Sequence, residues 1–400
     1  MRIVHLLPYY APAWSFGGVV RAVHGLVTAL AGKGHMITVI TTDAGDRGRR
    51  LPSGPDTVDG VPVVRCRNAW PVLRRLNLSS PVGLRGILHE ALATADVLHV
   101  HEFRTVENLM ALPLARQMHV PVVLSPHGTL PYAAGRRTIK RLWDMLPGRR
   151  AARYVDHVVA LTADEVAEAR ALWTRLGIPL PEAAISVVPN GVDPALFAAL
   201  PPCEVFRSRW QIPADKPLVL FLGRLHERKG VHHLLDALPH MPGIWLAVVG
   251  PDEGQGAALR RQADRLGVAD RVVFTGLLTG DDKLAAFSAA DVLALPAVGE
   301  GLPMVALEAM AAGLPVALSD GCHLQEAVEA GAGVRLEPLT GVGVAAVLAP
   351  LLGNVGQRRA MANRGKKLVA ARFTWGAVVE AVEKVYAAVS AERGESQTAQ

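Results

Sequence analysis

The sequence predicts an α/β protein that contains two doubly wound domains. Short β-branched runs alternate with longer helical patterns along the chain, which is typical of parallel sheets built from βαβ units. A Pro-rich break at 194–217 separates two such series. The length of 400 residues also exceeds what one ordinary hydrophobic core covers. These observations predict one parallel sheet in each half of the chain, joined near 190–215.

The first series is expected to hold seven strands, with helices in most of the intervals. Residues 19–31 show the helical pattern plainly, because valine and leucine side chains recur on one face. The expected strands are Ile3–Leu7, Met36–Thr42, Val61–Cys66, Val97–Val100, Val122–Ser125, His157–Leu161 and Ile185–Val188.

The second series is expected to hold five strands, again separated by helical stretches. Ligands of doubly wound sheets bind beyond the carboxyl ends of the strands, so we expect a site in the cleft between the two domains. The expected strands are Leu218–Leu222, Ile244–Val249, Arg271–Phe274, Val292–Leu295 and Pro315–Leu318.

Cysteine spacing and hydropathy bear on the compartment. Cys66, Cys203 and Cys322 lie more than a hundred residues apart without metal-ligand spacing, which favours buried thiols in a reduced compartment. The N-terminus lacks a long apolar segment with a cleavage site, and no apolar run reaches the roughly 18 residues of a spanning helix. We therefore expect a cytoplasmic protein.

Positive charge is concentrated in the first half of the chain. Residues 1–200 carry a net charge of +7, and residues 201–400 carry −1. High arginine usage is the plain interpretation, and an anionic surface or acceptor meeting the first half is the sharper one. Seven basic residues lie between Arg136 and Arg153, around an apolar stripe. The 136–153 segment is therefore expected to be a helix that either packs its stripe on the core or lies on an anionic membrane. The stripe is Ile139, Leu142, Trp143 and Leu146.

Two carboxylates stand in the otherwise apolar segment GEGLPMVALEAMAAGLPV at 299–316. Glu300 falls in a loop after a buried strand, and Glu308 falls inside the helix that follows. An unpaired buried carboxylate costs several kcal/mol. Either both side chains reach solvent or a ligand binds them, and we favour a ribose or sugar, whose vicinal hydroxyls donate well to carboxylates.

Basic residues follow the first strand of the second series, in GRLHERKG at 223–230. Arg224 and Lys229 precede a helix expected to begin near Val231, and basic side chains beside a helix N-terminus suit a diphosphate. The segment does not match a Walker A loop. No Asp-x-Asp triplet occurs in the chain, so we expect no metal and assign the diphosphate charge to these two cations.

Two weaker signals lie in the first half. Gly17 and Gly18 open a helix after an aromatic loop, so backbone N–H groups there are accessible to a ligand, although a tight turn is an equal explanation. His127 follows a buried strand in SPHG. A structural role is as common for such a histidine as a functional one, and the same holds for His99 and His101.

Together these motifs resemble the retaining glycosyltransferases of the GT-B fold, family 4. The resemblance rests on SFGGVV, SPHG, VVPNGVD, GRLHERKG and GEGLPMVALEAMAAGLPV, and extends from Ile3 to about Trp375. It implies two facing Rossmann-like domains with a cleft between them. The implied parts are an acceptor domain at 1–195, a nucleotide-sugar domain at 196–375, a final helix at 376–392 that crosses back to the first domain, and a disordered tail at 393–400.

The resemblance also implies roles in donor binding. Glu308 would hold the ribose hydroxyls, and Glu300 would contact the donor sugar near its C3 and C4 hydroxyls, with Gly301 and Leu302 in the same loop. Many family members read Glu-Gly-Phe-Gly-Leu-Pro here, whereas this chain continues directly from Gly301 to Leu302 and Pro303. The loop against the donor sugar therefore has a different shape, which leaves the identity of the sugar open.

The remaining implied roles concern the reaction. Arg224 and Lys229 would bind the diphosphate and help it leave, and His127 would contact the donor sugar near its anomeric centre. Gly17 and Gly18 would touch the donor phosphate or the acceptor. The implied activity is metal-independent, retaining transfer from a nucleotide-diphosphate sugar to a glycan or lipid-linked acceptor, in cell-surface polysaccharide synthesis. No cofactor and no nucleic acid are expected.

Three alternatives were weighed. A sugar-nucleotide 2-epimerase shares the architecture, but the aromatic loop at 9–16 and the Arg224/Lys229 pattern argue against it. A noncatalytic sugar-nucleotide-binding protein would be expected to lack one of the charged site residues, and all are present. A dinucleotide oxidoreductase is disfavoured because neither first βα turn carries GxGxxG.

Overall fold

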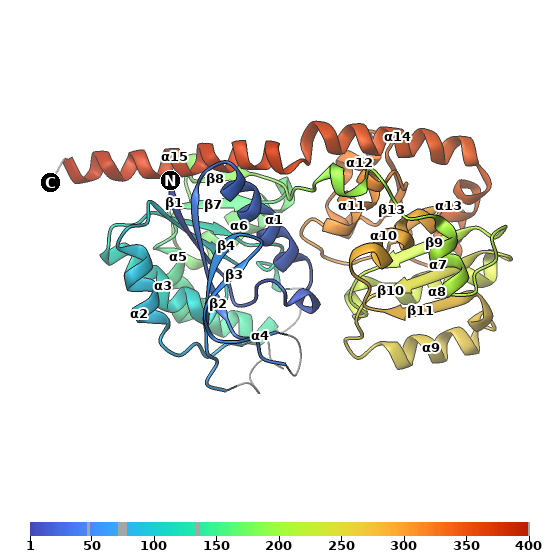
Figure 1. Ribbon diagram of the computed structural model, residues 1–400, viewed down its shortest axis with the longest axis horizontal. Helices are drawn as coiled ribbons and strands as arrows, with labels where there is room; N and C mark the ends of the chain where they lie inside the picture. Colours follow the sequence, from blue (N-terminus) through green and yellow to red (C-terminus); the bar gives the residue numbers. More distant parts are fainter. Residues whose placement is uncertain (46–48, 71–77, 133–136, 399–400) are drawn as a thin grey trace. The chain divides into compact units, whose positions relative to one another are not determined.

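The computed structural model describes residues 1–45, 49–70, 78–132 and 137–398 (Figure 1). Its contacts divide the chain into two compact units. Unit 1 comprises Met1–Gly191 and Trp375–Gln400, and unit 2 comprises Val192–Thr374. The divisions fall near the boundaries proposed from the sequence at 195 and 375. Each unit is a parallel sheet covered by helices, so the predicted fold class is confirmed.

The sheet of unit 1 has eight strands in the order β3-β4-β2-β1-β5-β6-β7-β8. Neighbouring strands pair in parallel except for β3 and β4, which form an antiparallel hairpin. The strands are β1 (Arg2–Leu6), β2 (Met36–Thr42), β3 (Gly54–Val58), β4 (Val61–Cys66), β5 (Val97–His101), β6 (Val122–Ser125), β7 (His157–Ala160) and β8 (Ile185–Val187).

Strand β3 was not predicted, because Gly, Pro and Asp in GPDTV disfavour a strand. The signal that identifies it is the turn that follows. Asp59 and Gly60 both have positive φ, 48° and 80°, as a two-residue hairpin turn requires. The strand lies at the sheet edge, where its exposed side chains need no apolar pattern.

Helices cover both faces of this sheet. On one face, α1 (Gly18–Gly32) and α15 (Trp375–Thr398) share a core with the strands. On the other, α2 (Leu84–Leu92), α3 (Val106–Gln117) and α6 (Ala163–Leu176) form a second core. The indole ring of Trp375 packs directly on Gly25 of α1. A Cβ at position 25 would lie 2.1 Å from this ring, so only glycine fits there. The close approach fixes the start of α15 against unit 1.

Helix α15 corrects one expectation at the C-terminus. It continues to Thr398, so residues 393–398 are helical where the sequence suggested a disordered tail. The physical reason is propagation: extending an established helix is far easier than nucleating one, and AERGESQT contains good helix formers.

The basic segment is not the single helix that the sequence suggested. It forms α4 (Arg137–Trp143), a π-helical turn at Asp144–Gly148, and α5 (Arg149–Ala152), while Arg136 lies outside the described residues. Pro147 lies inside the π-turn and interrupts the regular α-helical hydrogen bonding there. Ile139, Leu142 and Leu146 are 58%, 62% and 79% exposed, so these three members of the stripe do not pack on the core, whereas Trp143 is partly buried.

The sheet of unit 2 has six parallel strands in the order β11-β10-β9-β12-β13-β14. They are β9 (Leu218–Leu222), β10 (Trp245–Val249), β11 (Val272–Gly276), β12 (Val292–Leu295), β13 (Val316–Leu318) and β14 (Gly333–Arg335). Strand β14 was not predicted, because its segment GVR has a single β-branched residue between glycine and arginine. The helices are α7 (Cys203–Arg209), α8 (Val231–Ala237), α9 (Gly256–Arg265), α10 (Gly280–Ala289), α11 (Met304–Ala312), α12 (Gln325–Glu329), α13 (Gly341–Gly353) and α14 (Val355–Arg372).

Each sheet has one point where the strand order reverses. In unit 1 the chain winds outward from β1 and returns to place β5 on the other side of β1. In unit 2 the same reversal places β12 beside β9. Loops that leave two such strands diverge above and below the sheet, and ligands of this fold class bind at that opening. Within the described part of the chain, no helix is long and apolar enough to cross a lipid bilayer.

Candidate active site

The switch point of unit 2 brings two predicted residues together. Lys229 lies in the loop after β9, and Glu300 lies in the loop after the neighbouring strand β12. The Nζ atom of Lys229 is 2.7 Å from Oε2 of Glu300. Both side chains are largely buried. The two loops approach each other closely at Gly230, which has a φ of 71°. Only glycine fits there, because a Cβ would lie 2.0 Å from the carbonyl oxygen of Pro296.

The ionisation of Glu300 follows from its neighbours. Burial alone would raise the pKa of this carboxyl group, but Lys229, Arg224 and Arg228 outweigh burial and lower the pKa below its ordinary value. The carboxylate is therefore ionised at neutral pH. It accepts one proton of the Lys229 ammonium group, which has three protons to donate.

Arg228 fixes the loop that carries Glu300, and sequence reasoning gave it no role. Its guanidinium group donates to the carbonyl oxygens of Val298 and Gly299, and its own carbonyl accepts from the N–H of Val298. Glu300 itself donates its N–H to the carbonyl oxygen of Gly321, at 2.7 Å. These bonds hold the loop from both sides. In the same loop Leu302 is buried and Gly301 is partly exposed.

Glu308 is buried on α11, with only 8% of its surface exposed. Its charge is balanced by Lys283 of α10, whose Nζ lies 2.6 Å from Oε2. The first alternative drawn from the sequence is therefore wrong, because neither Glu300 nor Glu308 is freely solvated. A lysine of the chain itself pairs with each, and ligand binding by the two carboxylates stays a prediction. A buried carboxylate needs such a partner, because water is excluded there. The ion pair engages Oε2 of Glu308, and a carboxylate offers two oxygens to hydrogen-bond donors.

Arg224 follows β9 directly and is 39% exposed. Its Nη1 atom lies 3.1 Å from both carboxylate oxygens of Glu253, in the loop after β10. Gly250 brings these two loops together, since a Cβ there would lie 1.8 Å from the carbonyl oxygen of Gly223. Glu253 was not singled out from the sequence. It orients the guanidinium group of Arg224 at the same strand ends as Lys229.

Gly17 and Gly18 lie in unit 1, where the loop after β1 enters α1. Gly17 is the N-cap and has a φ of 99°, a conformation that other residues rarely adopt. Gly18 is exposed, and a Cβ there would meet nothing within 4 Å. No side chain caps this end of the helix. The need for glycine is therefore conformational at Gly17, whereas Gly18 has room for a ligand or a methyl group.

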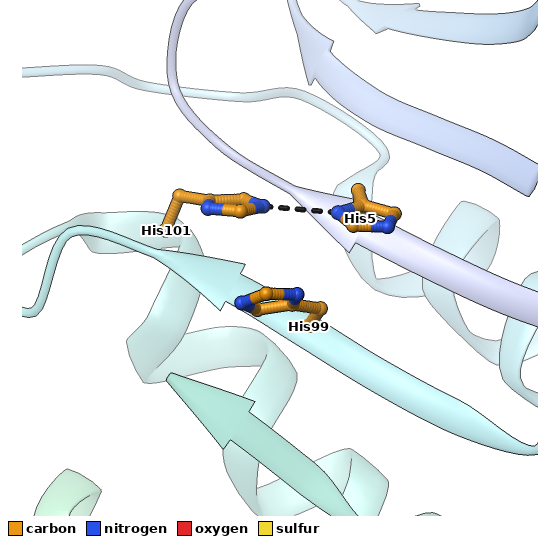
Figure 2. A group of neighbouring side chains, drawn as sticks. All are labelled: His5, His99 and His101. Atoms are coloured by element: carbon orange, nitrogen blue, oxygen red, sulfur yellow. Dashed lines mark hydrogen bonds between the residues drawn. The ribbon is translucent and has the colours of Figure 1, made fainter. Parts of the chain in front are cut away.

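His127 lies beyond β6 and is the end of a chain of imidazoles. Figure 2 shows His5 of β1 and His101 of β5 joined by a hydrogen bond, with His99 beside them. The bond joins His5 Nδ1 and His101 Nε2 at 3.0 Å, and His101 Nδ1 lies 3.0 Å from His127 Nε2. The switch point of unit 1, between β1 and β5, holds this chain. The sequence gave no sign of it, because His5 is far from the other three along the chain.

These imidazoles are neutral. Burial lowers the pKa of His5 to about 3 and that of His127 to about 4, and it also lowers the pKa values of His99 and His101. Nε2 of His5 is buried without a hydrogen-bond partner. A bare nitrogen is tolerated there better than an unpaired N–H. The favoured arrangement therefore has His5 donating to His101 and His101 donating to His127, which leaves the proton of His127 on Nδ1.

One ring nitrogen from each of His5, His99 and His101 lies within 4.8 Å of the other two, which raises the question of a metal. The donor set does not fit one well. Both nitrogens of His99 already bond, to Tyr386 and Ser125, at 2.7 and 2.8 Å. The rings of His99 and His101 are stacked with centroids 4.4 Å apart, whereas metal ligands must point their in-plane lone pairs at one centre. The group is a hydrogen-bonded stack.

Glu165 positions the His127 loop and was also not predicted. Its carboxylate accepts from the N–H of Gly128 and from the N–H of Leu161, the latter at 2.7 Å. The side chain is buried at the start of α6. His127 itself has a φ of 55°, an uncommon conformation that these bonds help to maintain.

Two family models and several curated proteins match this chain. Residues 204–368 match the model described as Glycosyl transferases group 1, and residues 16–196 match the model described as Glycosyltransferase Family 4. The chain is 30% identical over 340 residues to a 2-deoxystreptamine N-acetyl-D-glucosaminyltransferase of Streptomyces fradiae, covering 76% of each protein. It is also 30% identical over 333 residues to the glycogen synthase of Mycobacterium tuberculosis, covering 76% of this chain and 74% of that one.

Solved structures show the same fold. The sucrose-phosphate synthase of Thermosynechococcus elongatus aligns with a TM-score of 0.75 at 23% identity, covering 98% of this chain and 99% of that one. HepE of Anabaena, crystallised with UDP-glucose, aligns with a TM-score of 0.76 at 20% identity, covering 97% and 100%. The fold is thus the GT-B fold, as the resemblance implied.

Proposed function

The chain belongs to the glycosyltransferases, in the families named by the two matching models, and on that premise we propose a specific reaction. The protein is a retaining, metal-independent enzyme that moves a sugar from a nucleotide-diphosphate sugar to a glycan or lipid-linked acceptor in cell-surface polysaccharide synthesis. The observation that carries this proposal is the buried Lys229–Glu300 pair at the switch point of unit 2, with Arg224 at the end of β9, the strand that also leads to Lys229. A sugar-nucleotide epimerase is not favoured, since the matched families and relatives are transferases.

The diphosphate is assigned to Lys229 and Arg224. Cleavage of the sugar–phosphate bond develops negative charge on the leaving diphosphate, and cations already held in place stabilise that charge without reorganisation. Glu300 engages one side of the Lys229 ammonium group, which leaves N–H donors for phosphate oxygens. Glu253 holds the Arg224 guanidinium group in a comparable way. These two side chains would supply the charge that a metal supplies in other enzymes.

The sugar and the ribose are assigned to the two glutamates. Glu308 binds the ribose hydroxyls through the carboxylate oxygen that Lys283 does not engage. Glu300, with Gly301 and Leu302, binds hydroxyl groups of the donor sugar. Each glutamate already has its charge balanced by a lysine. This suits the binding of sugar hydroxyls, because a hydroxyl group is neutral and could not balance the charge of a buried carboxylate.

Retention is assigned to same-face attack by the acceptor, the favoured account for this family. His127, a neutral imidazole with its proton on Nδ1, donates that hydrogen bond at the donor sugar near the reacting carbon. Gly17 and Gly18 present backbone N–H groups to the donor phosphate or the acceptor. The stereochemical part is tested by the anomeric configuration of the product, read by NMR.

The acceptor side is assigned to unit 1. Ile139, Leu142 and Leu146 are exposed beside basic residues of α4 and α5, a combination that favours an anionic membrane surface. We therefore place the enzyme on the cytoplasmic face of the cell membrane. An amine acceptor, such as the one named for the Streptomyces relative, is disfavoured by the net charge of +7 in residues 1–200.

Release of nucleoside diphosphate in the presence of a membrane extract tests the activity. The donor is supplied with EDTA and, separately, with added Mg²⁺. Equal rates with and without EDTA support metal independence, and a rate that requires Mg²⁺ refutes it. Retained anomeric configuration in the product supports same-face attack, whereas inversion overturns it.

A further inference from the structure

A second charged site lies in unit 1, away from the histidine chain. It is a pocket of about 660 Å³, a volume in the range of small-molecule sites. The residues that give it its character are Tyr132, Asp144, Arg137, Arg141, Arg149 and Arg175. They come from the loop after β6, α4, the π-turn, α5 and the last turn of α6. Four guanidinium groups from three helices therefore surround one space.

The single acid in this pocket is already engaged. Asp144 is buried and accepts two hydrogen bonds from Arg104, at 2.9 and 2.8 Å, and one from the hydroxyl of Tyr132, at 2.7 Å. Among the ion pairs of the described residues, none joins a carboxylate to Arg137, Arg141, Arg149 or Arg175. Four positive charges therefore remain to be balanced by a ligand or by solvent ions.

Tyr132 orders two of these arginines. The guanidinium carbon of Arg175 lies 4.6 Å from the centre of the tyrosine ring, and that of Arg141 lies 5.8 Å from it. Stacking on an aromatic ring restricts a long side chain and leaves the edge of the guanidinium group free to donate. The ring is itself held by the bond to Asp144. The cations are thus partly preorganised around the pocket.

The pocket is joined to His127 by a short, well-fixed loop. Only four residues lie between His127 and Tyr132, so their Cα atoms, five positions apart, are separated by at most about 18 Å. The loop between them is held by Arg104, which donates to the carbonyl oxygen of Thr129 at 2.8 Å, and by Lys140, which donates to that of Pro131 at 2.7 Å. A group held in the pocket therefore lies within the span of an oligosaccharide or lipid-linked sugar from His127.

We propose that this pocket binds a phosphate or diphosphate group of the acceptor, so that the acceptor is a phosphorylated sugar or a lipid-linked sugar phosphate. The assignment rests on the proposed function for the identity of the acceptor, but the phosphate binding does not. Planar guanidinium groups bind phosphate oxygens bidentately, and several of them converging without acids suit a doubly charged group. Asp144 does not oppose this ligand, because Arg104 neutralises it.

Calorimetric titration with pyrophosphate tests the pocket, with glycerol 3-phosphate as a monoester probe. The full chain carries Arg224→Ala and Lys229→Ala in this experiment, which removes the two cations of unit 2 that are assigned to the donor diphosphate. In that background Arg149→Gln/Arg175→Gln removes two pocket charges. The matched control is Arg150→Gln/Arg153→Gln, which removes two exposed charges from the same segment outside the pocket. All four side chains are exposed, so folding is expected to survive and is checked by thermal unfolding.

The pocket variant is expected to bind pyrophosphate at least about tenfold more weakly, about 1.4 kcal/mol, and the control to stay within about twofold. Equal weakening by both pairs would show a diffuse field and overturn the proposal. Absence of pyrophosphate binding at about 10 mM, a Kd worth under roughly 3 kcal/mol, would also overturn it.

Vesicles separate the acceptor from membrane headgroups. Binding to phosphatidylglycerol vesicles, with phosphatidylcholine as the neutral reference, is compared for the same two pairs. An acceptor phosphate is supported if both double variants change vesicle binding equally and only the pocket variant loses pyrophosphate binding. Selective loss of vesicle binding by the pocket pair assigns the pocket to lipid headgroups and overturns the acceptor assignment. The proposed function is tested separately with the protein that keeps Arg224 and Lys229. If that protein binds no nucleotide sugar, the proposed function is refuted, and the pyrophosphate result still stands.

Discussion

Replacing Lys283 by methionine should destabilise the protein by about 3–5 kcal/mol, the cost of leaving a buried charge unpaired. Lys283 and Glu308 are 7% and 8% exposed, and their charged atoms are 2.6 Å apart. The ring of Phe287 lies 5.7 Å from the ammonium nitrogen, so an apolar side chain borders the pair. Methionine fills a similar volume without charge, which isolates the electrostatic loss from a packing defect.

A double-mutant cycle measures this coupling directly. Glu308→Gln should cost a similar amount alone, because it leaves Lys283 charged and buried. The double variant Lys283→Met/Glu308→Gln should recover most of the loss, since replacing a buried pair by uncharged groups of similar volume is often neutral or even stabilising by about 1–4 kcal/mol. The free energy of unfolding of all four proteins is obtained from urea titrations at pH 7.5. Single losses under about 1 kcal/mol, the value typical of exposed pairs, would refute the reasoning.

Three further predictions follow from the same structure. Lys229→Met should lower kcat by about a hundredfold or more if the ammonium group stabilises the leaving diphosphate, and an unchanged kcat in steady-state kinetics would contradict this role. Acid should destabilise the protein as pH falls from 6.5 to 5, because the lowered pKa values of about 3 for His5 and about 4 for His127 let only the unfolded state gain protons in that window. At pH 5 each of the two histidines lowers the free energy of unfolding by about 2 kcal/mol. In urea unfolding, His127→Gln should remove the part of this acid-induced loss that His127 causes, whereas the exposed control His89→Gln should leave the loss unchanged. Charge reversal at Arg137, Lys140 and Arg141 should abolish co-sedimentation with anionic vesicles, and a wild type that never sediments with them excludes the membrane assignment.

The fold was readable from the sequence because buried parallel strands are marked by local patterns. Twelve strands were expected, and the structure has all of them, with ends that differ from the expected ones by at most two residues. The two that were not expected are an exposed edge strand and a strand with one β-branched residue, and neither carries an apolar pattern. The basic segment was expected to be one helix because its apolar stripe follows helical spacing. Pro147 interrupts that helix, although it does not disturb the spacing of the stripe.

Site residues could be predicted where they stand close together in the sequence. Contacts between residues that are brought together only by the fold could not be predicted. Glu300, Arg224 and Lys229 stand out as charges in apolar or Gly-containing loops at strand ends. Lys283 did not stand out, because it lies in the polar first turn of helix α10 and pairs with Glu308 of another helix. The contact of His5 with His101 depends on strand order, which local patterns do not specify.

Unit 2 is expected to bind a nucleotide-diphosphate sugar through Lys229, Arg224, Glu300 and Glu308. This binding can be measured by calorimetric titration of the wild type with UDP-, GDP- and ADP-sugars, with and without EDTA. We expect one preferred donor whose affinity is insensitive to EDTA. We also expect Glu308→Ala to weaken binding of that donor by about 1.5–3 kcal/mol, the value of a hydrogen bond to a charged group. Absence of binding by every nucleotide sugar, or full affinity in the Glu308→Ala variant, would contradict it.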